Sequence, residues 1–497
     1  MNDLNQRMAR GAAWMVLLRF SERAIGLVST VLLARILVPA DFGLVAMAMS
    51  VYAAVEIMTM FSFDIALIQN RDAGKEHFDT AWTFNIIFGG GIMLLMAAAA
   101  YPAASFYADE RVAPVMMWLG LGAFFRGFEN IGVIYFQKDL NLRKEFELGL
   151  TRKLVGFAVT VGIALAYQNY WALVIGTLVQ RVFGVAMTFI IHPYRPRLSL
   201  AKASELFAFG KWLAINNLLI FLNHRVPDIF IGRQLGSASL GLFNVSYEVA
   251  NLPTTELVFP IGRAVFPGYS ALANDAAGLR TAYLRVLGLI VFLTLPIATG
   301  MYLLAEPMVL TVLGPKWRDA IPLIQTLAVF GFIRAVISNS GSVYVALGQT
   351  RLTTYMSIYY LAILLPAMWF CISHWQLAGA AYAVLLTAVC QTPIALFVAF
   401  RMVGAGFGSL IELFWRPTLA TALMWIAVEL LQQQPQVQAW AHPLRLLAGV
   451  ALGAAVYVAA VMTAWILSGR RTGAERDLLL MLVPKRFRSG LVREVHP

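Results

Sequence analysis

Three charged residues lie inside an apolar stretch near the start of the chain. Within the segment 12–34, Arg19, Glu22 and Arg23 fall at i, i+3 and i+4, so they share one face of a helix. A charge at the centre of a bilayer costs about 2.5–3.5 kcal/mol on insertion scales, and charges that persist there usually face a bundle interior or a wet cavity. The cluster therefore predicts a path for a polar solute. An ion pair whose arginines reach the headgroups is an open alternative.

A second charged group lies in the later apolar segment 206–231. Arg225 and Asp228 form an i, i+3 pair, and the neighbouring His224 is a candidate for a proton-linked group. Such a pair fits a purely structural role as well as a role in transport. Further charges lie in four other apolar segments: Glu56 with Asp64, Arg126 with Glu129 on one predicted helix, Glu248, and Arg334.

The residue types in this set indicate the chemistry of the solute. A guanidinium group stays charged and pairs with phosphate oxygens, so a cavity lined with arginines suits an anionic substrate such as a diphosphate-linked sugar. The carboxylates are candidates for coupling to protons or sodium, and structural hydrogen bonding fits them equally well. The predicted substrate-binding residues are Arg19, Arg23, Arg126, Arg225 and Arg334, and the predicted ion-coupling residues are Glu22, Glu56, Asp64, Asp228 and Glu248.

Composition predicts that helices in a membrane position these residues. The chain has 497 residues, of which 60% are hydrophobic and 13% charged, and its mean hydropathy is +0.72. A soluble domain carries about 25% charged residues. A helical span needs about 20 apolar residues, and the apolar runs here are that long and lack the alternation of barrel strands. We predict fourteen spans, at about 12–34, 42–66, 80–101, 113–136, 146–166, 171–191, 206–231, 239–261, 282–304, 320–347, 352–372, 376–400, 416–431 and 443–468.

The basic residues predict how these helices are oriented. The net charge is +12, and most of the 38 Lys and Arg residues fall in the loops that a cytoplasmic N-terminus would place inside, when charges in the end turns of a span, Arg152 among them, are counted with the adjoining loop. This bias follows the positive-inside rule and puts both termini on the cytoplasmic side. The excess charge then reflects topology and contact with anionic lipid headgroups, and it argues against binding to nucleic acid.

An internal repeat divides the predicted helices into two halves. A shift of 198 residues aligns the first two spans with the seventh and eighth, so that Gly43 matches Gly241, and a weaker echo at a shift of 208 aligns Arg126 with Arg334. Parallel halves are a known transporter plan, with the substrate site at their interface. We predict lobes at 1–192 and 193–402, an added helix pair at 403–468 and a basic cytoplasmic tail at 469–497.

Several kinds of chemistry have no matching motif in the sequence. There is no GxxxxGK(S/T) loop for nucleotide hydrolysis and no GxSxG or HExxH motif, and the six histidines lack the spacing of metal ligands. The predicted loops are too short to hold a soluble catalytic domain, which argues against a polysaccharide polymerase or ligase. We therefore expect no enzyme activity, no cofactor and no metal.

Two stretches resemble signatures of a known transporter family. The stretch ARILVPADFGLVAMA at 34–48 and the phrase FPGYSAL at 266–272 are similar to sequences of bacterial polysaccharide transporters of the Wzx type. These are a branch of the multidrug/oligosaccharidyl-lipid/polysaccharide (MOP) flippase superfamily. The resemblance covers nearly the whole chain and implies a MATE-like fold with two six-helix lobes, two further helices and cytoplasmic termini.

The resemblance also implies a function. Members are thought to flip undecaprenyl-diphosphate-linked oligosaccharides from the cytoplasmic to the outer leaflet of the inner membrane by alternating access, for lipopolysaccharide, capsule or exopolysaccharide assembly. Glycosyltransferases and a polysaccharide polymerase of the same pathway are then expected partners. The alternative is a cation-coupled multidrug exporter of the same superfamily. The intramembrane arginines argue against it, because the substrates of such exporters are mostly cationic.

Overall fold

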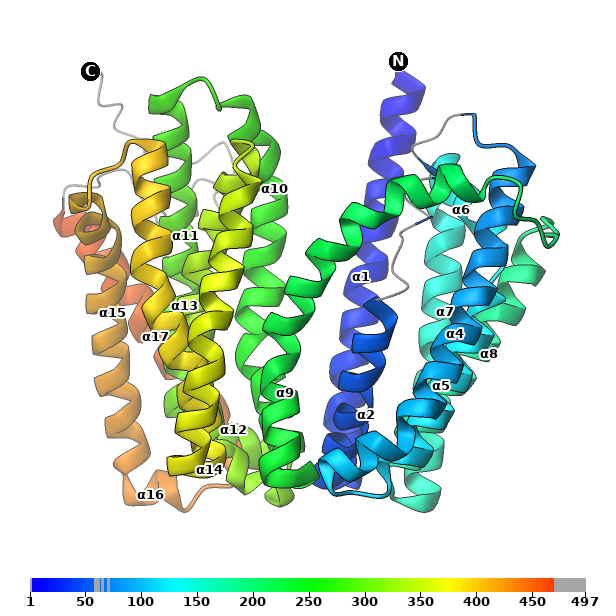
Figure 1. Cartoon of the computed structure of the whole chain (residues 1–497). Coiled ribbons are helices and arrows are strands. Elements are labelled where there is room, and N and C mark those ends of the chain that lie inside the picture. Colours follow the sequence, from blue (N-terminus) through cyan, green and yellow to red (C-terminus); the bar gives the residue numbers. More distant parts are fainter. Residues whose placement is uncertain (1, 58–62, 64–66, 69–71, 469–497) are drawn as a thin grey trace. The chain divides into compact units, whose positions relative to one another are not determined.

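The fold is helical throughout the part of the chain that can be described. The computed structural model describes residues 2–57, 63, 67–68 and 72–468, with the side chains of 2–9, 205–220 and 224 excepted. These residues form helices and connecting loops, and none of them forms a strand (Figure 1). The predicted all-helical class is confirmed. Asp64, the tail 469–497 and the side chain of His224 lie outside the described residues.

Contacts between the helices divide the chain into two compact units, unit 1 at Met1–Asn244 and unit 2 at Val245–Pro497. The lobe boundaries expected from the repeat, at 1–192 and 193–402, stay a prediction.

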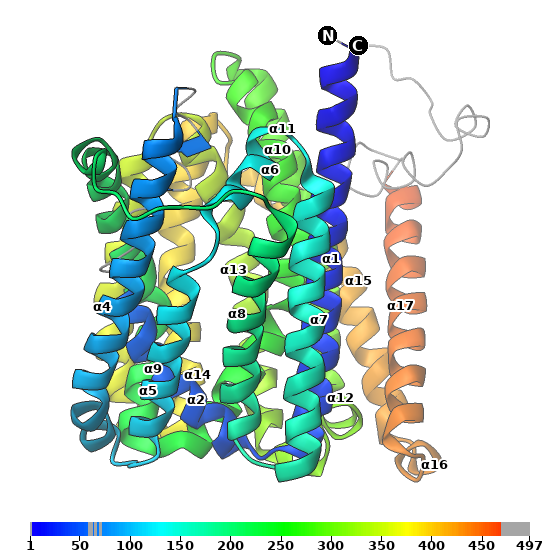
Figure 2. The same cartoon turned by 90° about the vertical axis from the view of Figure 1, so that its right-hand side faces the viewer.

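Within unit 1, α1 and α7 run side by side (Figure 2). The helices of unit 1 are α1 (Asn2–Ile36), α2 (Pro39–Ile57), α4 (Lys75–Tyr107), α5 (Val112–Gly127), η1 (Ile131–Val133), α6 (Ile134–Lys138), α7 (Leu142–Tyr167) and α8 (Trp171–Ile191), and α9 (Ala203–Pro253) continues into unit 2.

Unit 2 follows α9 with a short π-helical turn and a second set of helices. One hydrophobic core of this unit lies where α11, α13 and α14 meet, around the buried side chains of Tyr283, Tyr344 and Phe400. The elements are η2 (Thr254–Val258), α10 (Phe259–Ala271), α11 (Ala276–Leu303), α12 (Ala305–Val312), η3 (Pro315–Ala320), α13 (Ile321–Ala346), α14 (Thr350–Val403), α15 (Gly408–Gln433), α16 (Pro435–Gln438) and α17 (His442–Leu467).

Helix lengths agree with membrane crossing, although the predicted number of spans is not confirmed. Nine helices in the described ranges are long and apolar enough to cross a membrane. The charged helix α1 is not among them. Two helices are interrupted, α9 at Gly236 (φ 81°, ψ −178°) and α14 at Gln376 (φ 48°, ψ −127°), so each consists of two helices joined at a bend. The predicted breaks between spans near 235 and 374 therefore correspond to bends without an intervening loop.

Small residues let neighbouring helices approach closely, as is usual where lipid replaces water. A Cβ on Gly89 of α4 would stand 2.8 Å from the carbonyl oxygen of Ala123 on α5. Between α7 and α8, a Cβ on Gly176 would overlap the side chain of Thr160. Within the glycine run at 89–91, it is therefore Gly89 that allows close packing of α4 against α5.

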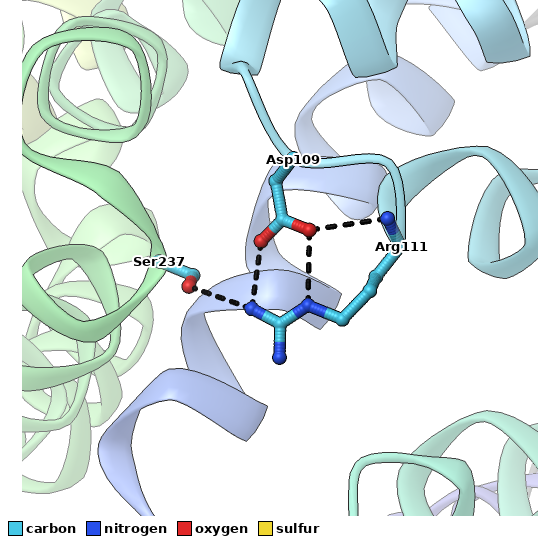
Figure 3. A network of polar contacts seen from close by, with 3 residues as sticks. All are labelled: Asp109, Arg111 and Ser237. Carbon is cyan, nitrogen blue, oxygen red and sulfur yellow. Dashed lines mark hydrogen bonds and ion pairs between the residues drawn. The ribbon is translucent and has the colours of Figure 1, made fainter.

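The loop between α4 and α5 carries an ion pair that reaches α9. The Arg111 guanidinium donates to both carboxylate oxygens of Asp109, over 2.9 and 2.8 Å, and the Arg111 amide donates to the same carboxylate over 3.1 Å (Figure 3). The guanidinium also lies 3.5 Å from the hydroxyl of Ser237. These bonds from Arg111 lower the pKa of the Asp109 carboxyl below its ordinary value.

Candidate functional site

Unit 1 contains a cavity of about 780 Å³ that several helices line together. Its walls come from α1, α2, α4, α5 and α7 and from the short turns η1 and α6. The volume lies within the range of about 300–1,000 Å³ that is typical of small-molecule sites. The charged lining residues are three arginines and four glutamates, namely Arg19, Arg126, Arg152, Glu22, Glu56, Glu129 and Glu145.

The first ion pair in this cavity joins α5 to α2. The Arg126 guanidinium donates to the Glu56 carboxylate over 3.0 Å, and the hydroxyl of Tyr52 lies 3.4 Å from the same carboxylate oxygen. More than half of the Arg126 side chain, 58%, is exposed, so the guanidinium remains accessible from the cavity. The Arg126 guanidinium could therefore bind an anion either by releasing the Glu56 carboxylate or at the side that the carboxylate leaves open.

The second ion pair differs from the one predicted by sequence spacing. The predicted span 113–136 placed Arg126 and Glu129 on one helix, and Arg152, near the start of the predicted span 146–166, was counted with the adjoining loop. Instead, Glu129 accepts from the Arg152 guanidinium over 3.0 Å, and Arg152 lies within α7. The placement of Arg126 and Glu129 on one helix is wrong because α5 ends at Gly127, two residues before Glu129. Arg152 falls inside the predicted span 146–166, and its helix α7 begins earlier than predicted, at Leu142.

Close packing and a capping residue cause the break after α5. A Cβ on Gly127 would lie 2.6 Å from the carbonyl oxygen of Asn85, so α5 lies against α4 at this point. Asn130 then caps η1, since its side chain accepts from the amide of Gly132. The backbone amide of Asn130 donates to the Thr188 hydroxyl over 3.1 Å. This buried turn directs Glu129 toward α7.

The remaining residues on α1 and α7 complete the cavity wall. Arg19 is exposed and Glu22 half-buried, and both line the cavity, whereas the half-buried Arg23 does not. On α7, Glu145, Gly149 and Arg152 fall at i, i+4 and i+7, so they form one stripe facing the same space. Sequence reasoning missed Arg152 and Glu145, although this helical spacing is visible in the sequence.

Four other predicted site residues lie outside this cavity, two in each unit. In unit 1, Asp228 is buried on α9 and accepts from Arg225 over 2.9 Å and from Ser50 over 3.3 Å. This confirms the predicted i, i+3 pair but places it outside the cavity lining. In unit 2, Glu248 is exposed, and Arg334 donates to the hydroxyl of Tyr247 and lies 6.0 Å from its ring centre.

The cavity is therefore mixed in charge. The sequence had suggested a basic cavity instead. Its four glutamates outnumber its three arginines, and two of the arginines are in ion pairs with glutamates. Buried or semi-enclosed charges need such partners in a medium of low dielectric constant. An arrangement of exchangeable ion pairs can accept an anion at the guanidinium groups and a cation or protons at the released carboxylates.

The sequence matches a family model described as polysaccharide biosynthesis protein over residues 32–322. It is 25% identical over 431 residues to the lipopolysaccharide biosynthesis protein WzxC of Escherichia coli strain K12, a match that covers 84% of this chain and 85% of that protein. It is also 22% identical over 472 residues to the teichuronic acid biosynthesis protein TuaB of Bacillus subtilis strain 168, a match that covers 94% and 97%.

Solved structures share the fold. The lipid II flippase MurJ, in an inward closed conformation, has a TM-score of 0.74 and 14% sequence identity, and the match covers 93% of this chain and 99% of that one. An inward-facing multidrug resistance transporter of the MATE family has a TM-score of 0.59 and 13% identity, with 77% and 94% covered. At these identities the likeness shows the fold alone, and it confirms the predicted MATE-like architecture.

Proposed function

This chain belongs to the family of polysaccharide biosynthesis proteins, and we propose that it is a flippase that moves a lipid-linked oligosaccharide from one leaflet of the membrane to the other. Two of its relatives are named for lipopolysaccharide and teichuronic acid biosynthesis, which supports a role in surface polymer assembly. A fold shared with a lipid II flippase supports translocation of a lipid-linked substrate.

The observation that carries this proposal is the set of guanidinium groups in the unit 1 cavity. Arg19, Arg126 and Arg152 line one space, and the last two are in ion pairs that a stronger anion can displace. A diphosphate offers several oxygens to each guanidinium in the bidentate geometry that arginine favours. The proposed substrate is therefore an undecaprenyl-diphosphate-linked oligosaccharide, with these arginines on its diphosphate.

The glutamates supply a route for coupling. When a diphosphate takes the place of Glu56 on Arg126, the carboxylate loses its counter-charge in a space of low dielectric constant, and uptake of a proton or a sodium ion offsets that loss. Release of the substrate reverses the exchange. Glu129 beside Arg152 repeats the same arrangement. We propose proton or cation exchange at Glu56 and Glu129 as the coupling step, with Glu22 nearby on α1.

The setting follows from the same proposal. The protein lies in the bacterial inner membrane with both termini in the cytoplasm, and it moves its substrate to the outer leaflet by alternating access between two lobes. Glycosyltransferases that build the oligosaccharide and a polymerase that consumes it are the proposed pathway partners. The basic tail 469–497 carries charge suited to anionic headgroups of the cytoplasmic leaflet.

A cation-coupled multidrug exporter is the second candidate, and the four glutamates in the cavity favour it. Exposed guanidinium groups in the same cavity would repel a cationic drug, which is why the flippase is preferred. The two functions differ in a simple test. Vesicles containing the exporter would transport ethidium against a proton or sodium gradient, and vesicles containing the flippase would not.

A reconstitution assay tests the flippase directly. Protein in vesicles with a lipid-linked oligosaccharide from the same pathway should move the sugar away from periodate added outside. We expect Arg126→Gln with Arg152→Gln to slow this movement at least about tenfold, since each lost charged hydrogen bond costs about 1.5–3 kcal/mol. Arg143→Gln is the matched control, because Arg143 pairs with Glu147 on the exposed face of α7. Unchanged movement in the double variant would contradict the proposal.

A further inference from the structure

Unit 2 contains a second cavity, of about 540 Å³, formed by α10, α11, α13 and the start of α14. It begins at Val258, the last residue of the π-helical turn η2, and π-helical turns occur frequently at functional sites. The turn is held on α13 by the Thr254 hydroxyl, which donates to the carbonyl oxygen of Gly331 over 3.0 Å.

This cavity corresponds in sequence to the cavity of unit 1. The weaker repeat, at a shift of 208 residues, aligns six of its lining positions with six positions that line the unit 1 cavity. Ser338 aligns with Asn130, and Thr353 aligns with Glu145. The aligned positions are 338, 339, 341, 342, 345 and 353 in unit 2, and 130, 131, 133, 134, 137 and 145 in unit 1. Each unit therefore builds a cavity from equivalent parts of its own helices.

The chemistry of the two cavities differs. Of the described residues that line the unit 2 cavity, Arg263 alone carries a charge, and the polar groups are the hydroxyls of Ser338, Ser342 and Thr353 and the amide of Asn339. Where unit 1 places Glu145, unit 2 places a threonine. With four neutral hydrogen-bonding side chains and one arginine, this cavity is less suited to the two charges of a diphosphate than the unit 1 cavity with its three arginines, and it is well suited to neutral groups that both donate and accept hydrogen bonds.

Asn339 gives the cavity an unused hydrogen-bonding group. Its side chain is 1% exposed and lines the cavity, and its Oδ1 accepts from the Tyr269 hydroxyl over 3.1 Å. The amide nitrogen Nδ2 is buried without a partner among the described residues. If the amide is turned over, the hydroxyl pairs with the nitrogen and the oxygen is left instead, so one polar atom lacks a partner in either orientation. A buried polar atom of this kind destabilises the fold unless a ligand or water satisfies it.

Two aromatic rings border the same space. Phe259 and Phe266 both line the cavity and are 41% and 38% exposed. A sugar ring presents hydroxyl groups at its edge and C–H bonds on its face, and the negative face of an aromatic ring attracts such positively polarised C–H groups. An aromatic surface beside an amide and three hydroxyls therefore matches both parts of a sugar.

We propose that the cavity of unit 2 binds the uncharged sugar part of the translocated substrate, with Asn339 as the main hydrogen-bonding group and Phe266 as the stacking surface. This rests on the proposed flippase function, and it assigns the two chemical parts of the substrate to different units. The diphosphate is bound by the arginines of unit 1 and the sugar by the neutral groups of unit 2.

Two soluble probes separate the two sites. Mild acid releases the oligosaccharide from its lipid diphosphate and provides the sugar probe, and farnesyl diphosphate provides the charged probe. Binding of each to the purified full-length protein is measured by calorimetry. We expect Asn339→Leu and Phe266→Ala each to weaken binding of the oligosaccharide about tenfold, as loss of one or two good contacts would, without changing binding of farnesyl diphosphate. Arg126→Gln should do the reverse.

Phe397→Ala on α14 is the control for Phe266→Ala, because Phe397 is 50% exposed and does not line the cavity. Phe266 is itself partly exposed, so its variant stays informative if Asn339→Leu fails to fold. The proposal is overturned if the wild-type protein does not bind the oligosaccharide, or if both variants bind it as the wild type does. Failure of farnesyl diphosphate to bind would instead count against the flippase function, whatever the sugar probe shows.

Discussion

Gly43 and Gly241 hold α2 and α9 in backbone contact, and they do so reciprocally. A Cβ on Gly43 would overlap the carbonyl oxygen of Ser237, and a Cβ on Gly241 would overlap the carbonyl oxygen of Pro39. The two glycines are separated by 198 residues, and so are the two carbonyl groups that they approach, those of Pro39 and Ser237. The contact therefore follows the internal repeat, with each copy supplying one glycine and one carbonyl group.

This contact predicts a large effect from a very small substitution. Gly43→Ala must separate α2 from α9, because the neighbour is backbone and cannot move aside as a side chain can. We expect the free energy of unfolding to fall by about 1–3 kcal/mol, the usual cost of overpacking. This appears as a lower thermal midpoint in detergent. Gly26→Ala on α1 is the control, since a Cβ at Gly26 meets nothing within 4 Å. A midpoint that is equal in Gly43→Ala and Gly26→Ala would contradict the prediction.

Features that depend on spacing within one helix were predictable, and contacts between distant segments were not. Hydropathy located the helices, and i, i+3 spacing predicted the Arg225–Asp228 pair. The two stretches resembling polysaccharide transporters, at 34–48 and 266–272, lie within the residues that match the family model.

The ion pairs of the cavity show why the rest was hidden. Arg126 and Glu56 are 70 positions apart, and nothing in either local sequence selects the partner. Glu129 was assigned to the wrong partner because the end of α5 depends on how Gly127 packs against α4, which is a tertiary contact. Residues on different helices become neighbours through packing, and one sequence read alone contains no record of it.

The exchange of ion pairs predicts opposite effects for the two members of one pair. Arg126→Gln removes a positive group and should weaken binding of farnesyl diphosphate. Glu56→Gln removes the competitor for that group while keeping a similar shape, so it should strengthen binding, by about two- to fivefold for a pair worth up to about 1 kcal/mol. Calorimetry in the same buffer compares both variants. Weaker binding in Glu56→Gln would show that the carboxylate helps to hold the anion site and does not compete with it.

Proton uptake at the released carboxylates can be measured in the same experiment. If binding of farnesyl diphosphate transfers protons to Glu56 and Glu129, the observed heat depends on the ionisation enthalpy of the buffer, with a positive slope for protons taken up by the protein. We expect this slope in the wild type and its reduction in Glu56→Gln with Glu129→Gln. A slope of zero in the wild type would leave sodium exchange as the coupling step, which a dependence on sodium concentration then tests.

The Asp109–Arg111 pair predicts a pH dependence of stability. Because the pKa of Asp109 is lowered in the folded protein, the pair stabilises the fold above the ordinary value of 3.8, and this contribution is lost as the pH falls through the lower, folded pKa. The effect should be small, since the Arg111 side chain is 48% exposed. Asp109→Asn should therefore lower the thermal midpoint slightly between pH 5 and pH 7, and the difference from wild type should vanish in strong acid. Glu147→Gln in the exposed pair with Arg143 is the control, and an equal loss there would remove the special role of Asp109.

Asp228 offers a choice between the ion-coupling role predicted from the sequence and a structural one. Its carboxylate is buried and accepts from both Arg225 and Ser50, which joins α9 to α2. Asp228→Ala would leave the Arg225 charge without this partner, and breaking a buried pair in this way costs about 3–5 kcal/mol. Asp228→Asn keeps the acceptor oxygen while removing the titratable charge. We expect Asp228→Ala to fold poorly and Asp228→Asn to fold and still move lipid-linked sugar in vesicles. Loss of that movement in a well-folded Asp228→Asn protein would instead assign Asp228 to ion coupling.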